Sequence, residues 1–312
     1  MTFYAGQVVT ASQMNTELGV ATFRAGQKLR QSQLDPVLEP GERVRAVDLN
    51  QIFGDGGGGP GPGPVGDVPG DVLDLTNWKW QGPTEDPNDE GDLIEVEQPE
   101  LDTYDDAALF LDDVTQRVIM LAPVQGFETS DATRSEFREM EGATEAAWSP
   151  FHPTPRSLTV HERVDPTSLT DRQEIIVGQI HGAGSSPIPL ILSIEWDTAA
   201  DAPRLRVFHD SPSVPPSLLT PGLSTTTDYT YRIAYEPGND PENGTGRVDV
   251  TAAFGDPSNL PAEPEPEHSF PASAFDDQVG WYFKFGSYNK SKKADGGSGT
   301  ARVEIISMQL IQ

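Results

Sequence analysis

Three short segments place charged or titratable side chains at every second position, the spacing that brings side chains to one face of a strand. In the first, residues 134–138, this spacing puts Arg134, Glu136 and Arg138 on one face. Two arginines can hold carboxylates through paired hydrogen bonds, and a glutamate between them keeps the guanidinium groups oriented. Taken alone, such a row is more often an exposed ion-pair ladder.

The second segment ends a strongly strand-forming stretch, residues 174–181. Gln179 and His181 share one face, while Ile180 points to the opposite face, which we expect to be the core. A histidine titrates near neutral pH and can serve as a general base. An isolated histidine in this position is more often a hydrogen-bonded structural residue, so its interpretation depends on what lies beside it.

The third segment, residues 281–290, predicts a strand with two different faces. One face is aromatic and suits the core; it carries Trp281, Phe283 and Phe285. The opposite face has two tyrosines and two lysines around a glycine that leaves room: Tyr282, Lys284, Gly286, Tyr288 and Lys290. Such a face suits a saccharide lying across the sheet.

The elements that must position these segments are strands. From residue 72 to residue 312, Gly, Pro and Asp clusters separate short β-branched or alternating segments, a pattern typical of an all-β fold. These segments are residues 117–124, 157–164, 204–209, 229–235 and 302–311. The nearest competitor for a helix is residues 131–147, and the Pro-rich residues 256–271 read as a surface loop. Many short strands over this length predict a sandwich or jelly roll.

Two smaller parts precede this body. Residues 54–71 are so rich in glycine and proline that they predict a linker. Residues 1–53 contain an internal repeat, in which residues 6–15 match residues 26–35 and, more weakly, residues 41–50. Each copy predicts a turn, a short extended piece and one or two helical turns. Because such units cannot bury a core alone, we expect them to pack on one another or on a partner.

Composition excludes several classes of function. The 312 residues include no cysteine, which excludes disulfides, thiolate metal sites and a cysteine nucleophile. The net charge is −28, which argues against a nucleic-acid partner, although salt adaptation explains it at least as well as any role in binding. Residues 1–53 hold five basic and five acidic side chains, so the excess lies after them. No apolar run is long enough for a membrane helix, and residues 1–20 lack the pattern of a secretion signal.

Together, the three segments resemble the motifs of polysaccharide lyase family 7, the alginate lyases: R-[ST]-E-[LV]-R, Q-[IV]-H and Y-F-K-x-G-x-Y-x-Q. Residues 74–79, 97–101 and 122–124 also follow the family's order, so the resemblance spans nearly all of the body. It implies a concanavalin-like jelly-roll β-sandwich with the site on the concave sheet. Departures from the pattern are Phe137, Phe285, Lys290 and residues 79–83. We expect both phenylalanines in the core, whereas Lys290 bears on substrate preference.

The resemblance also implies a reaction, the β-elimination of a uronate-containing, alginate-like polysaccharide. Arg134 and Gln179 would bind the uronate carboxylate and so neutralise its charge through the arginine. His181 would be the general base, and Tyr288 would protonate the departing oxygen. The remaining predicted site residues would bind or orient the substrate: Glu136, Arg138, Tyr282, Lys284 and Lys290. The scheme needs no metal and no cofactor.

The N-terminal repeats are similar to those at the start of minor tail proteins of tailed bacterial viruses, which begin Ala-Gly-Gln and end Ser-Gln-Leu/Met-Asn. This similarity implies a place in the virion tail, contacts with other tail proteins through residues 1–53, and extracellular action on a host capsule or exopolysaccharide. A homotrimer is consistent with it, since tail fibres and spikes are often trimeric. The alternative for residues 1–53 is an unrelated oligomerisation tag.

Other functions remain open for the body at this stage. The main one is a non-catalytic carbohydrate-binding module for receptor recognition, because a jelly roll does not itself fix function. A purely structural tail protein would leave the three segments unexplained. A glycoside hydrolase would need a matched pair of carboxylates, and only Glu136 stands out. A base and an acid are not needed for adhesion, which favours the lyase.

Overall fold

The computed structural model describes residues 9–10, 43–44, 66–127, 132–165, 168–170, 174–182, 188–197, 202–209, 217–218, 227–240, 245–260, 266–275 and 280–312. The chain divides into two compact units, Met1–Val65 and Gly66–Gln312. In the described residues, no helix is long and apolar enough to cross a membrane.

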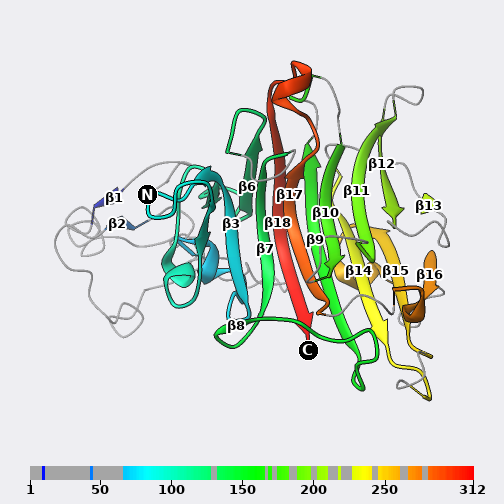
Figure 1. Cartoon of the computed structure of the whole chain (residues 1–312). Helices are drawn as coiled ribbons and strands as arrows, with labels where there is room; N and C mark the ends of the chain where they lie inside the picture. The colour runs from blue at the N-terminus through cyan, green and yellow to red at the C-terminus, as the bar shows by residue number, and fades with distance from the viewer. Residues whose placement is uncertain are drawn as a thin grey trace, which may run out of the picture. The chain divides into compact units, whose positions relative to one another are not determined.

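The larger unit contains a nine-stranded antiparallel sheet (Figure 1). Its order is β13 (Ser217–Leu218), β12 (Ala202–Phe208), β11 (Leu190–Asp197), β10 (Glu174–His181), β17 (Tyr282–Asn289), β7 (Arg134–Glu141), β3 (Trp78–Glu85) and β4 (Leu93–Val96). The ninth strand, β8 (Thr144–Glu145), pairs with β7 outside this path. Strands far apart in the sequence, such as β7, β17 and β10, therefore lie side by side.

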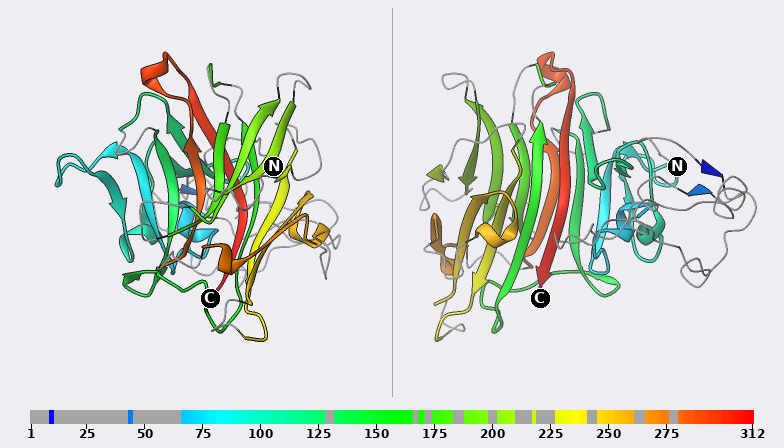
Figure 2. Two further views of the ribbon diagram at one scale, coloured as in Figure 1. Left: turned by 45° about the vertical axis from the view of Figure 1, so that its right-hand side comes forward. Right: turned by 180° about the vertical axis from the view of Figure 1, so that it is seen from behind.

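A second, seven-stranded antiparallel sheet packs against the first; Figure 2 shows both layers from two further directions. Its order is β16 (His268–Pro271), β15 (Arg247–Phe254), β14 (Tyr229–Glu236), β9 (Arg156–Asp165), β18 (Thr300–Ile311), β6 (Val118–Pro123) and β5 (Leu109–Leu111). Short 3-10 turns complete the described elements: η3 (Pro69–Asp71), η4 (Glu100–Thr103), η6 (Pro257–Asn259), η7 (Ala272–Phe275) and η8 (Lys293–Asp295). The jelly-roll β-sandwich predicted from the sequence is confirmed.

The core lies between the two sheets and is made by alternate residues of each strand. Phe137 and Phe285, two of the departures from the family pattern, are both fully buried there with ring centroids 5.0 Å apart. Trp78 packs edge-on against Phe285 at 4.7 Å. The prediction that both phenylalanines face the core is confirmed, and the two larger rings fill space against each other.

Most strand predictions agree with the structure, and two segments need comment. The described part of residues 131–147, the nearest competitor for a helix, contains β7 and β8. The prediction of a surface loop over residues 256–271 is wrong at its end, because residues 268–271 form β16 and bury Phe270. An edge strand tolerates the proline that suggested a loop, since its outer N–H positions need no partner.

Residues of the N-terminal unit are described only in β1 (Val9–Thr10) and β2 (Arg43–Val44), which pair antiparallel. The first and third repeats therefore contact each other through their extended pieces, as expected if the copies pack on one another. The rest of the repeats and residues 54–65 of the predicted linker lie outside the described residues. Residues 66–71 belong to the larger unit, in which Gly66 N–H donates to Gln116.

Candidate active site

The order β10-β17-β7 brings the three sequence motifs together on neighbouring strands. Between β17 and β7, Tyr288 lies opposite Arg134 and Lys284 opposite Arg138. Between β17 and β10, the same Lys284 lies opposite Gln179. Eight of the nine predicted site residues thus lie on adjoining strands, and Lys290 directly follows the end of β17. The side chains that alternate with them, such as Phe283 and Ile180, fill the core on the other face. We call the face that carries the site residues the outer face of the nine-stranded sheet.

Glu136 is the centre of a buried polar cluster on this face. Its two carboxylate oxygens accept hydrogen bonds from Gln179 Nε2 at 2.6 Å and from Lys284 Nζ at 2.7 Å. Arg134 lies further away, 3.8 Å from the same carboxylate. Glu136, Gln179 and Lys284 are each at most 3% exposed. A charge buried this far from water must be paired, and each partner here holds the other in one position.

The ammonium group of Lys284 has an unusual environment for a lysine. Burial lowers its pKa to about 8, while the Glu136 carboxylate beside it favours the charged form. Lys284 was predicted to bind or orient the substrate, and in the structure its Nζ donates a hydrogen bond to Glu136. In this structure Lys284 therefore holds Glu136, and through it Gln179, in place, and it adds positive charge below the surface.

His181 lies at the edge of this cluster and is half-buried. Its Nδ1 is 2.7 Å from the Gly182 carbonyl and 3.0 Å from the Tyr282 hydroxyl. A carbonyl can only accept, so the contact with Gly182 requires a proton on Nδ1. In the neutral ring the lone pair is then on Nε2, the nitrogen available to take a proton. Burial lowers the pKa of His181, which favours this neutral form; the Gly182 carbonyl opposes the shift and Lys284 adds to it.

Arginines stack on both tyrosines of the third motif. The Arg134 guanidinium carbon is 4.6 Å from the centre of the Tyr288 ring, and that of Arg138 is 4.0 Å from the centre of the Tyr282 ring. Lys290 Nζ also lies over Tyr288, at 5.2 Å. These cation–π contacts orient the phenol rings along the sheet. Tyr282 is 6% exposed and its burial raises its pKa, so it packs beneath the site, whereas Tyr288 is only half-buried.

Comparison with known proteins places this chain in a family. The family model for alginate lyases, Alginate_lyase2, matches residues 73–310. The chain belongs to this alginate lyase family. It is a polysaccharide lyase, and the match covers both sheets of the larger unit. A search of curated proteins finds no significant match.

Solved alginate lyases share the fold of this lyase. The alginate lyase from Corynebacterium sp. is 21% identical, with 80% of this chain and 99% of that chain covered and a TM-score of 0.60. The one from Klebsiella pneumoniae is 18% identical, with coverage of 78% and 98% and a TM-score of 0.59. The enzyme from Pseudomonas aeruginosa is 20% identical, with coverage of 76% and 99% and a TM-score of 0.56. At these identities the likeness concerns the fold.

Sequence reasoning missed part of the outer face, on strands β3 and β4 of the lyase. Lys79 lies opposite Arg138, and Gln81 lies opposite both Glu136 on β7 and Glu95 on β4. These residues belong to the departure from the family pattern at residues 79–83. The alternation Trp78-Lys79-Trp80-Gln81 was the available signal, because buried tryptophans at every second position put the polar pair on the face of the site.

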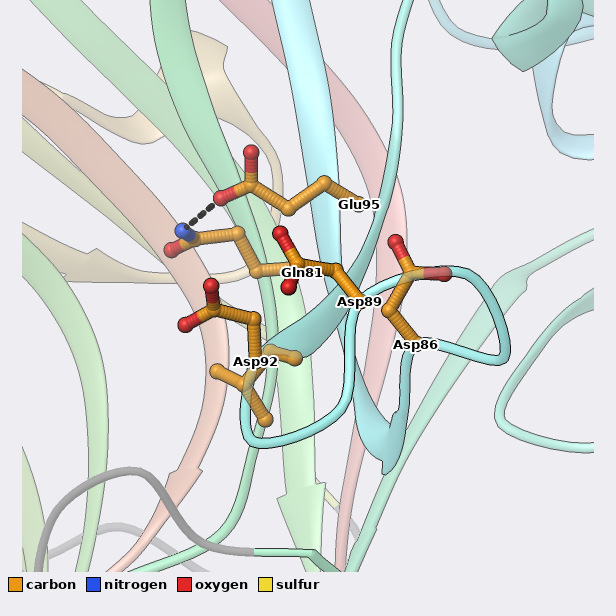
Figure 3. Close-up of a pocket in the computed structure, with 6 residues that line it drawn as sticks. Gln81, Asp86, Asp89, Asp92 and Glu95 are labelled. Carbon is orange, nitrogen blue, oxygen red and sulfur yellow. Dashed lines mark hydrogen bonds between the residues drawn. The ribbon is translucent and has the colours of Figure 1, made fainter.

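A hollow opens beside this pair, at the β3–β4 hairpin (Figure 3). Its lining is mostly acidic: Gln81, Asp86, Asp89, Asp92, Leu93 and Glu95. Gln81 Nε2 donates to Glu95 Oε1 at 2.6 Å across its floor. The described residues include no group of three or more histidine or acidic side chains placed to hold a metal ion. The hollow therefore borders the site as a negatively charged surface.

Proposed function

We propose that this lyase cleaves a uronate-containing, alginate-like acidic polysaccharide by β-elimination on the outer face of its nine-stranded sheet. The observation that carries the proposal is the placement of His181 beside the buried Glu136–Gln179–Lys284 cluster. There the Nδ1–H of the ring donates a hydrogen bond to the Gly182 carbonyl, which leaves the lone pair of Nε2 available. The base therefore lies next to side chains that can stabilise the charge produced by its action.

The proposed reaction starts at the carbon that bears the uronate carboxylate. Arg134 and Gln179 bind the carboxylate, and the positive charge of Arg134 neutralises it, which lets negative charge develop on it as an enolate-like species. His181 Nε2 takes the proton from C5, and the electrons of that C–H bond form the C4–C5 double bond. The C4–O4 bond breaks, and the hydroxyl of Tyr288 protonates the departing oxygen. The products are a new reducing end and an unsaturated sugar.

The unsaturated sugar supplies the test, because it absorbs in the ultraviolet and a hydrolysis product does not. Wild-type protein should release this absorbance from at least one purified uronate polymer. His181→Ala and Tyr288→Phe should each reduce it by about a hundredfold or more, the range for removing a general acid or base. Both variants should keep the wild-type melting temperature.

His152→Ala is the matched control, since its Nδ1 contacts Thr154 and it is not among the proposed site residues. This variant should retain full activity. Binding of a uronate polymer with no unsaturated product from any member of the panel would instead support a non-catalytic carbohydrate-binding module.

We further propose that residues 1–53 attach the lyase to a virus tail, where it degrades a host capsule or exopolysaccharide outside the cell. The support is the resemblance of the repeats to minor tail proteins and the pairing of the first and third copies through β1 and β2. Because the family match begins at residue 73, we expect catalysis not to require this segment.

Removal of residues 1–53 should therefore separate the two properties. The full chain should be found in purified virus particles from an infected host, and the shortened chain should be missing from them while its activity on a soluble polymer is unchanged. Equal incorporation of both chains into particles would refute the attachment role.

A further inference from the structure

Glu145 bridges two cations on the outer face of the nine-stranded sheet. One of its oxygens lies 2.7 Å from Lys79 Nζ and the other 2.7 Å from Arg138 NH2. The residue belongs to β8, the short strand that folds back from β7, and its side chain remains 45% exposed. Its carboxylate occupies the place between two cations that an incoming anionic group would be expected to take.

This bridge lies in line with the catalytic residues. Lys79, Arg138, Lys284 and Gln179 are opposite one another on four successive strands, β3, β7, β17 and β10. Neighbouring strands are about 4.8 Å apart, so Lys79 lies roughly 14 Å from Gln179 along the row. A polysaccharide that lies across the strands with its reacting uronate at Gln179 therefore passes over Lys284 and places a sugar further along the same chain over Arg138 and Lys79.

The charges along this row are balanced differently at its two ends. At the catalytic end, the single carboxylate of Glu136 faces both Lys284 and Arg134. At the other end, Lys79 donates hydrogen bonds to both Glu145 and Glu95. Arg138 forms an ion pair with the same Glu145. The acidic hollow of the β3–β4 hairpin adds further negative charge there. The two cations at this end are thus matched by Glu145 and Glu95, so a uronate carboxylate over Arg138 and Lys79 would meet no unbalanced positive charge.

The groups around the bridge are also hydrogen-bond acceptors. Glu95 and Glu145 each present carboxylate oxygens. A sugar hydroxyl can donate to such groups, whereas a carboxylate carries only acceptors. The chemistry of this surface thus fits an uncharged sugar better than a uronate.

We infer that Glu145 is a specificity-determining residue, which makes the subsite over Arg138 and Lys79 select a neutral sugar near the reacting uronate in the same chain. The preferred substrate is then a heteropolysaccharide in which uronates and neutral sugars are interspersed, not a polymer with a carboxylate on every residue. This inference rests on the proposed function, because it assigns the substrate class of the same site.

The test compares alginate with the same alginate after partial carboxyl reduction, which leaves the linkages unchanged and makes some residues neutral. Wild-type enzyme should show a kcat/KM, per uronate, about fivefold higher on the reduced polymer. Glu145→Gln removes the competing charge and keeps the length of the side chain. It should raise kcat/KM on intact alginate by about the same factor, and leave the value on reduced alginate nearly unchanged.

Glu141→Gln is the matched control on the same β7–β8 hairpin, since its carboxylate is 63% exposed and lies 3.8 Å from Arg156, away from Lys79 and Arg138. It should behave as wild type on both polymers. A wild-type preference for intact alginate, or an equal effect of Glu145→Gln on both polymers, overturns the inference and leaves the proposed function standing. Absence of unsaturated product from both of these polymers and from a panel of other uronate polymers overturns the proposed function itself.

Discussion

His181 shows how much of the proposed chemistry depends on one backbone atom. The Gly182 carbonyl determines which ring nitrogen carries the proton, and this choice determines which nitrogen can act as a base. The neighbouring residues then set the pKa of the ring. Burial has the largest effect and lowers that pKa, and the positive charge of Lys284 lowers it further.

The lowered pKa of His181 makes a prediction about pH. A base must be neutral to accept a proton, so activity should be present above the pKa of His181 and be lost as the pH falls through it. Because that pKa lies below the ordinary value of 6.5, the acid limb of kcat/KM against pH should have its midpoint below 6.5. An acid midpoint above 6.5 in the wild type would contradict this environment for His181.

At the residue scale, the types and spacing of the site residues could be predicted from the sequence, and their exposure could not. Gln179, Lys284 and Tyr282 appear in the sequence as polar positions on one strand face, which suggests contact with substrate. The structure buries all three: Gln179 and Lys284 donate hydrogen bonds to Glu136, and the Tyr282 hydroxyl contacts His181 Nδ1. Burial depends on what covers a face, which is not encoded in period-two alternation. Direct substrate contacts of these three residues remain predictions.

At the scale of the element, β17 depends on a glycine. Gly286 has a φ of 134°, a conformation that side chains rarely adopt, and a Cβ there would lie 2.5 Å from the Ser135 carbonyl oxygen of β7. From the sequence this glycine reads as open space for a sugar. The positive φ and the close approach of β7 are enough to explain why this residue is a glycine. The same close approach keeps Lys284 and Tyr288 opposite Arg138 and Arg134.

Gly286→Ala should therefore destabilise the lyase and disturb its site. We expect a loss of about 2 to 3 kcal/mol in the free energy of unfolding, from backbone strain and the clash with β7. Denaturant unfolding measures it, and activity should fall as the β7–β17 register is disturbed. Gly296→Ala is the control, since Gly296 has a φ of 79° but open space around its Cβ position. It should cost about 1 kcal/mol and leave activity intact. Equal effects of the two substitutions would show that the clash with β7 is unimportant.

At the scale of the whole molecule, the charge distribution was only partly predictable. The net charge of −28 and its location after residue 53 follow from the sequence. Alternation also puts the cations Arg134, Arg138, Lys284 and Lys290 on the predicted site faces of their strands. Once the strands are paired, Glu136 and Glu145 neutralise much of this positive charge, and Lys79 joins these cations from β3. The partners come from strands remote in the sequence, so no local pattern reveals them.

The sequence by itself determined the kind of fold and the chemistry that it carries. Short alternating segments can bury one face only by pairing into sheets, and three such segments hold the residues proposed for neutralisation, proton removal and protonation. Only the tertiary structure decided how these residues are used. The strand order put Glu136 between Gln179 and Lys284, and β8 put Glu145 between Lys79 and Arg138. Side-chain alternation assigns a residue to a face, whereas its neighbour across the sheet depends on strand order and register.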